Sequence, residues 1–131
     1  MGFPRLRQTV LDTTDNRGLA EFYRQLLGYE YRQGDEPPVE EQWLVLIGPE
    51  GQRLAFAQVD ALPTVTWPEG PVAQMLHLDL SVPDKTELDL QHQRALDLGA
   101  TLLQDRSDDA DEPLRVYADP AGHPFCIFVA G

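Results

Sequence analysis

Alternation of apolar and polar side chains from Leu76 to Val82 predicts a strand at residues 74–82. One face of this segment carries the apolar residues Leu76, Leu78, Leu80 and Val82. The opposite face carries Met75, His77, Asp79 and Ser81. Because successive side chains of a strand point to opposite faces, we expect the first face to pack in a core and the second to line a more polar surface. Residues 6–13 are rich in apolar and β-branched residues and predict another strand.

Apolar residues at helical spacing follow each of these two strands. The first helix follows two candidate N-caps, Thr14 and Asp15, and is expected to end at Gly28. The second is expected to begin at Asp84, where a glutamate three residues later completes a capping box, and to end at Gly99. Both helices therefore carry start and stop signals as well as an apolar stripe.

The chain repeats itself at half its length. The Gly-Pro-Glu-Gly turn at residues 48–51 and the Asp-Pro-Ala-Gly turn at residues 119–122 have the same separation as the two glycines that end the helices. Further strands are expected around these turns, at residues 29–33, 42–47, 52–58, 100–104, 114–118 and 123–129. The order βαβββ thus occurs twice, in modules 5–59 and 73–130 of a single domain that covers residues 1–131.

The segments between these elements are rich in proline or acid. The linker 60–72 contains three prolines, which favour an extended crossover over a helix or strand. Two acidic segments, 34–41 and 105–113, are expected to be loops without strands. The second has several aspartates but lacks the glycine and terminal glutamate of an EF-hand, so it is interpreted as a solvated loop.

Composition narrows the classes of function. The 131 residues include 10 basic and 22 acidic side chains, for a formal net charge of −12. Nucleic-acid binding is not expected, because it needs clustered Lys and Arg. No apolar run is long enough to span a membrane, and no signal peptide is apparent. Cys126 is the single cysteine and cannot form an internal disulfide, so a cytoplasmic location is expected.

Several motifs together resemble the vicinal oxygen chelate superfamily, which includes glyoxalase I, bleomycin-resistance proteins and extradiol dioxygenases. They are the Ala-x-Phe-Tyr-x-x-Leu-Leu-Gly segment at 20–28, Trp67-Pro68, His-Leu-Asp-Leu at 77–80 and Asp-Pro-Ala-Gly-His-Pro-Phe at 119–125. The resemblance is closest to small glyoxalase-like bacterial proteins. It implies an α+β fold in which two βαβββ modules form a curved eight-stranded mixed sheet with a central cleft. It also implies a homodimer.

The resemblance further implies where a metal would bind. The four corresponding positions are Gln8, Ala55, His77 and Cys126. The two last-strand positions are usually Glu in the family, whereas Ala55 offers no ligand and Cys126 offers a thiolate suited to softer ions. Ordinary glyoxalase I activity is therefore not expected, and neither a metal nor another cofactor is expected in the cleft.

Strand parity extends this set to a list of residues that are expected to line the cleft. The predicted ligand-binding residues are Gln8, Val10, Asp12, Ala55, Ala57, Trp67, His77, Asp79, Cys126 and Phe128. His77 and Cys126 are the candidate catalytic residues, as a base and a nucleophile. The alternative is that His77 is a hydrogen-bonded binding contact and that Cys126 is a small buried apolar residue.

Three functions are compatible with these features. The first is a glyoxalase/bleomycin-resistance-like protein that binds a small organic ligand, cationic or aromatic, in a metal-free cleft. The second is a divergent metal-dependent lyase, isomerase or dioxygenase-like enzyme that uses Gln8, His77 and Cys126. That enzyme would need a substitute ligand for Ala55, such as water or the carboxylate of Asp12 or Asp79. The third is an accessory domain that binds a protein partner.

Overall fold

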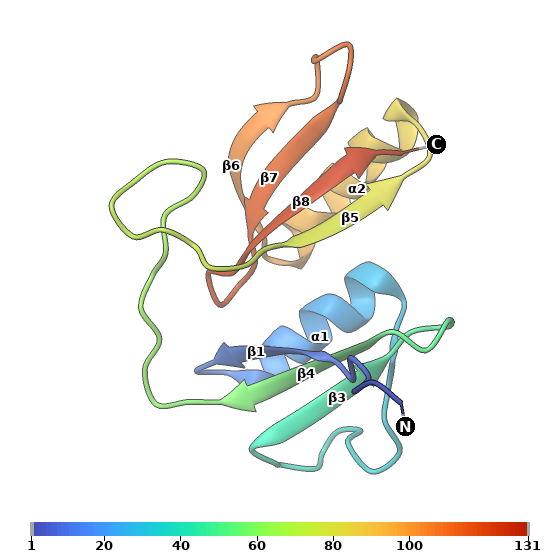
Figure 1. Ribbon diagram of the computed structural model, residues 1–131, viewed down its shortest axis with the longest axis vertical. Coiled ribbons are helices and arrows are strands. Elements are labelled where there is room, and N and C mark those ends of the chain that lie inside the picture. The colour runs from blue at the N-terminus through green and yellow to red at the C-terminus, as the bar shows by residue number, and fades with distance from the viewer. Residues whose placement is uncertain (1, 131) are drawn as a thin grey trace. The chain divides into compact units, whose positions relative to one another are not determined.

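Two βαβββ modules make up the computed structural model, which describes residues 2–130 (Figure 1). The first module contains β1 (Thr9–Thr13), α1 (Asn16–Leu27), β2 (Glu30–Tyr31), β3 (Trp43–Ile47) and β4 (Arg53–Gln58). The second contains β5 (Leu78–Val82), α2 (Lys85–Leu98), β6 (Thr101–Arg106), β7 (Leu114–Ala118) and β8 (Pro124–Val129). The chain divides into two compact units, of which the first ends at Leu62 and the second begins at Pro63.

Each module forms its own mixed sheet of four strands. The strand orders are β1-β4-β3-β2 and β5-β8-β7-β6. The first and last strands of a module pair in parallel, and the other neighbours pair antiparallel. In Figure 1 each helix lies across one face of its own sheet. The α+β fold and the βαβββ order are thus confirmed, with the eight strands divided between two sheets; the central cleft stays a prediction.

Both helices begin and end where the capping residues predict. The Asp15 carboxylate accepts a hydrogen bond from the Gly18 backbone N–H at 3.0 Å, and Asp84 accepts one from Glu87 N–H at 2.8 Å. Gly28 ends α1 with a φ of 71°, in the left-handed region where a side chain would be strained. No helix in residues 2–130 is long and apolar enough to cross a membrane.

Each module has an aromatic core between its helix and its sheet. Tyr23 of α1 stacks on Phe56 of β4 with ring centroids 6.0 Å apart, and both rings are fully buried. Tyr117 of β7 stacks on Phe125 of β8 at 5.1 Å, and these rings are also fully buried. The two pairs differ in kind, because the first joins a helix to a strand and the second joins two neighbouring strands.

The first strand of each module is shorter than its hydrophobic pattern predicts. Strand β1 begins at Thr9 and β5 begins at Leu78, so Gln8 and His77 each lie one residue before a strand. Pairing with the parallel partner starts only at Thr9 and at Leu78, so the residues before these points are not part of either sheet. The prediction that Leu76 packs in the core is therefore wrong: its side chain is 76% exposed.

The acidic segment at 105–113 was expected to contain no strand, and this prediction is wrong at its start. Strand β6 continues to Arg106 and pairs with β7 across a bulge between Leu102 and Gln104. The carboxylate of Asp105 lies 3.2 Å from Nε of Arg115, a buried guanidinium that also pairs with Asp89 at 2.9 Å. The ion pair with Arg115 of β7 stabilises Asp105 within the sheet.

Asp105 is expected to make the fold sensitive to acid. Hydrogen bonds from Ser107, followed by the contact with Arg115, lower the pKa of this carboxyl to about 2. A depressed pKa stabilises the folded state above the unfolded value, and this contribution disappears as the pH falls through the folded value. The side chain is 44% exposed, so the contribution is small. We expect the stability difference between wild type and Asp105→Asn to narrow from about pH 4 to about pH 2 in urea unfolding.

The other acidic segment, 34–41, contains no strand, as predicted. Its structure depends on Asp35, which is buried and accepts a hydrogen bond from the Val45 backbone N–H at 2.9 Å. Arg32 supplies the compensating charge at 3.1 Å. The loop is therefore held to β3 by a buried carboxylate.

Candidate functional site

The second module contains a pocket of about 310 Å³. Five of the residues predicted to bind a ligand line it: Trp67, His77, Asp79, Cys126 and Phe128. The other lining residues are Pro68, Gln104, Arg106, Glu112, Leu114 and Val116. Cys126 and Phe128 line the pocket, whereas Phe125 is buried in the core. That these residues bind a ligand stays a prediction.

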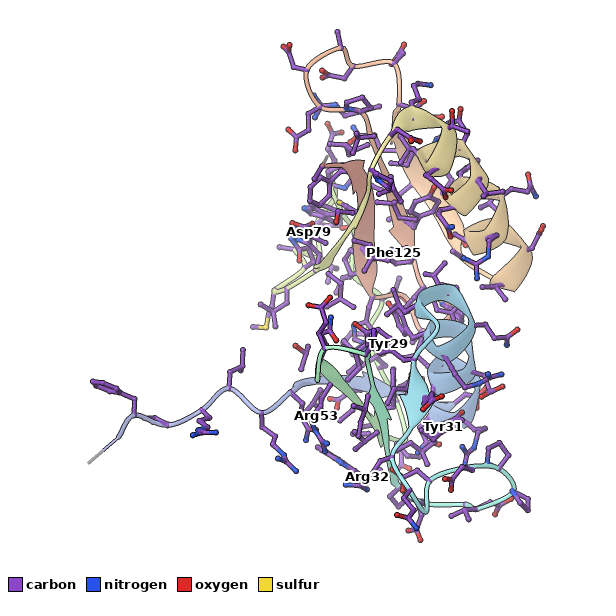
Figure 2. The ribbon with its side chains drawn as sticks, turned by 90° about the vertical axis from the view of Figure 1, so that its right-hand side faces the viewer. Tyr29, Tyr31, Arg32, Arg53, Asp79 and Phe125 are labelled. Carbon is purple, nitrogen blue, oxygen red and sulfur yellow. The ribbon has the colours of Figure 1, made fainter. Side chains whose placement is uncertain are left out.

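Strand register explains why these side chains meet. Asp79 pairs with Cys126, Cys126 with Val116, and Val116 with Gln104. Directly opposed residues point to the same face of a sheet, so one row of side chains crosses all four strands. Figure 2 shows Asp79 on the side of this sheet away from α2. The pocket therefore occupies the face that the helix leaves open.

His77 is held from two sides. Its Nε2 lies 3.1 Å from Oδ1 of Asp79, two residues further along on the same side of the chain. The indole of Trp67 stacks on the imidazole with ring centroids 4.6 Å apart and planes inclined by 21°. Asp79 and His77, which the sequence places on one face of the strand, therefore form a close pair. The stack with Trp67 adds an aromatic wall to the pocket.

A short closed loop in the linker positions Trp67. The backbone N–H of Thr66 donates to the Val72 carbonyl at 2.6 Å, and the Val72 N–H donates to the Thr66 hydroxyl at 3.0 Å. These bonds close the loop around the Trp67-Pro68 pair. The linker contains no helix or strand, as expected, but it folds back at this point instead of remaining extended throughout.

Cys126 is a poor candidate for a nucleophile. Burial, with a smaller contribution from the carboxylates of Asp79 and Glu112, raises the pKa of its thiol from the usual 9.0 to about 11. The thiolate is the reactive form, and at neutral pH it would be about one part in ten thousand of this thiol. The interpretation of Cys126 as a buried, neutral side chain is favoured over nucleophilic catalysis.

We expect Cys126 to react slowly in the folded protein. The raised pKa reduces the thiolate fraction at pH 7 about a hundredfold relative to an exposed cysteine, and burial reduces access further. The measurement compares maleimide labelling of native protein with labelling in denaturant, where the thiol is exposed. Equal rates in the two conditions would contradict this description of the thiol.

The first-module candidates lie together on one face of their own sheet. Val10 pairs with Ala55 and Asp12 with Ala57, so these four side chains share a side. The Gln8 side-chain carbonyl accepts a hydrogen bond from Arg53 Nε at 3.2 Å. Arg53 was not predicted, although it lies two residues before Ala55 on the same strand face. Whether Gln8, Val10, Asp12, Ala55 and Ala57 bind a ligand stays a prediction.

Some pocket residues were not predicted from the sequence. Arg106 lies in the part of β6 that extends past the predicted end at residue 104, whereas Gln104 lies within the predicted strand. Glu112 comes from the acidic segment that was interpreted as a solvated loop. Residues 101–106 do not alternate between apolar and polar side chains, so periodicity does not indicate that the strand continues past residue 104.

The residues at the family's metal positions do not form a conventional oxygen-rich site. Ala55 is fully buried and has no donor atom. Within the second module, however, Asp79 joins His77 and Cys126, and one ligand atom from each lies within 4.8 Å of the others. A nitrogen, an oxygen and a sulfur donor therefore meet at the inner end of the pocket.

Comparisons with solved structures place the fold among known proteins. A glyoxalase/bleomycin resistance/dioxygenase family enzyme from Burkholderia phytofirmans is 17% identical, with a TM-score of 0.71 over 94% of this chain and 96% of that one. A variant of the fosfomycin resistance protein FosX from Listeria monocytogenes, which holds Mn(II) and a dihydroxypropylphosphonic acid, is 16% identical, with a TM-score of 0.73 over 99% and 95%. Lactoylglutathione lyase from Agrobacterium tumefaciens is 18% identical, with a TM-score of 0.64 over 96% and 93%.

At such low identity these structures support the fold, and the FosX complex shows that one protein with this fold binds a small ligand. A search of curated proteins found no match. The glyoxalase-like domain family, in contrast, matches residues 8–128, which is nearly the whole chain. The chain therefore belongs to the glyoxalase-like domain family.

Proposed function

We propose that this protein binds a small, planar, aromatic and cationic ligand in the pocket of its second module. The observation that carries this proposal is the pocket itself, which combines an aromatic wall with carboxylates. Its volume of about 310 Å³ is at the lower end of the range for small-molecule sites. Trp67 and Phe128 offer apolar ring surfaces, which favour a planar partner.

The charges around the pocket favour a cation. Asp79 and Glu112 contribute two carboxylates, and both act on the buried Cys126 thiol. Arg106 is the one arginine in the lining, and its guanidinium is paired with Asp109 at 3.1 Å. The whole chain carries a formal net charge of −12, which also attracts cationic ligands. A cation beside an indole gains additional attraction from the ring.

Ligand binding in this proposal does not depend on a metal held jointly by the two modules. Ala55 occupies one of the four family positions and supplies no donor, which argues against such a site. The neutral Cys126 thiol also argues against covalent catalysis. The homodimer and the cytoplasmic location that we expect from the sequence stay predictions.

A fluorescence titration tests this function. Proflavine, a planar aromatic cation, is the probe, and the full chain is titrated in EDTA so that no metal contributes. We expect saturable one-to-one binding that Asp79→Asn weakens, and much weaker binding of the anionic dye anilinonaphthalene sulfonate. The Glu40→Gln variant removes an equal charge outside the pocket and is expected to bind like wild type. Absence of saturable proflavine binding, or stronger binding of the anion, would contradict the proposal.

A further inference from the structure

Three side chains with different donor atoms meet on the inner wall of the second-module pocket. They are the imidazole of His77, the carboxylate of Asp79 and the thiol of Cys126, and one ligand atom from each lies within 4.8 Å of the others. The His77 Nε2 and Asp79 Oδ1 atoms are already 3.1 Å apart. Cys126 is buried, whereas Asp79 is 59% exposed. The group is thus closed on one side and open on the other.

The fold holds these side chains in place without any ligand. Asp79 is the direct partner of Cys126 in the parallel pairing of β5 with β8. His77 precedes Asp79 by two residues and is covered by the Trp67 ring. All of these residues belong to the second compact unit, so the cluster does not depend on the first module.

The donor set matches a thiophilic divalent ion. Zinc is bound by nitrogen, sulfur and carboxylate oxygen at about 2.0–2.3 Å, usually with tetrahedral geometry. Ligand atoms on such an ion lie roughly 3.3–3.8 Å apart, so the cluster must contract by about 1 Å at its widest separation. Small rotations of the exposed Asp79 side chain and of the His77 ring can supply this contraction. Harder ions such as Mn²⁺ prefer several oxygen ligands. This cluster offers a single carboxylate, so it suits zinc better than manganese.

We propose that His77, Asp79 and Cys126 form a zinc site that lies entirely within the second module. Three protein ligands leave the fourth position of a tetrahedral ion open toward the pocket. This arrangement differs from the four family positions, which draw on both modules and include Ala55. Asp79 is not one of those positions, and it supplies the charged oxygen donor that the last strands lack.

The charges near the cluster also favour a cation. Asp79 and Glu112 surround the thiol with negative charge, and no Lys or Arg among residues 2–130 forms an ion pair with Asp79 in the structure. On binding, the Cys126 thiol would release its proton to solvent, and the thiolate would share the charge of the ion. The two positive charges of the ion would then balance the negative charges of the Asp79 carboxylate and the Cys126 thiolate.

Cobalt and zinc titrations of the full chain test this inference. Co²⁺ serves as a spectroscopic probe, because a thiolate ligand gives a charge-transfer band in the near ultraviolet. We expect one equivalent of Co²⁺ to produce this band and Zn²⁺ to remove it by displacement. Cys126→Ser is expected to abolish the band and to weaken Zn²⁺ binding at least tenfold. Asp79→Asn is expected to weaken Zn²⁺ binding at least tenfold while keeping the band.

Controls separate a site from a folding effect. Far-UV circular dichroism confirms that each variant is folded, and Glu40→Gln is expected to bind Zn²⁺ like wild type. Zn²⁺ binding that survives in folded Cys126→Ser, or no binding by wild type, would overturn the inference. The zinc site and the proposed ligand pocket share Asp79, but the two proposals are independent and can fail separately. Proflavine is titrated in EDTA, whereas the metals are titrated without any organic ligand.

Discussion

Replacing Trp67 with alanine is expected to weaken proflavine binding roughly thirtyfold. The indole stacks on His77 and forms one wall of the pocket, so its loss removes an aromatic surface from the ligand. Aromatic side chains at the centre of a binding site typically contribute about 2 kcal/mol, which corresponds to this change in Kd. A fluorescence titration of the variant against wild type measures the effect.

The matched control is Trp43→Ala, the other tryptophan of the chain. Trp43 lies on β3 of the first module, is 39% exposed and does not line the pocket. We expect this variant to bind proflavine with nearly the wild-type Kd. An equal loss for both variants would contradict the assignment of the ligand to the second module.

The Phe125→Ala variant is expected to lose about 3–5 kcal/mol of unfolding free energy. The ring of Phe125 is fully buried and stacks on Tyr117. Alanine leaves a cavity between the second sheet and its helix, and the surrounding rings cannot collapse to fill it. Urea unfolding followed by circular dichroism measures the change. Because Phe125 points away from the pocket, the effect concerns stability.

Phe125→Leu provides the control for this prediction, because leucine keeps most of the buried volume. We expect it to lose clearly less stability than Phe125→Ala. An average substitution costs about 1 kcal/mol. A smaller loss for Phe125→Ala would show that Phe125 contributes little to the stability of the second module.

Most of the fold could be predicted from the sequence because several signals agreed. The repeat, the alternation in the strands and the caps of both helices all indicated the same βαβββ order. The capping prediction at Asp84 was confirmed, since a side-chain oxygen needs only local geometry to reach the N–H of Glu87. Strand ends were less predictable, because Leu76 alternates correctly but has no partner strand. Whether a residue is paired depends on where the neighbouring strand begins, and the periodicity of a strand's own sequence does not reveal this.

The candidate site was predictable only in part, for a similar reason. Parity placed His77, Asp79 and Cys126 on one face, and the structure brings them together. The stack of Trp67 on His77 could not be predicted, because it requires the linker to fold back between Thr66 and Val72. Glu112 was missed because it belongs to the acidic segment that the sequence analysis interpreted as a solvated loop.

The most direct test of the proposed function is a ¹H–¹⁵N correlation spectrum recorded during a proflavine titration in EDTA. It reports which backbone amides sense the ligand. We expect the largest shifts at residues that line the second-module pocket, including His77, Asp79, Gln104 and Phe128, with amides of α1 unchanged. Shifts confined to the first module, or spread evenly over the chain, would contradict the proposal that this pocket binds the ligand.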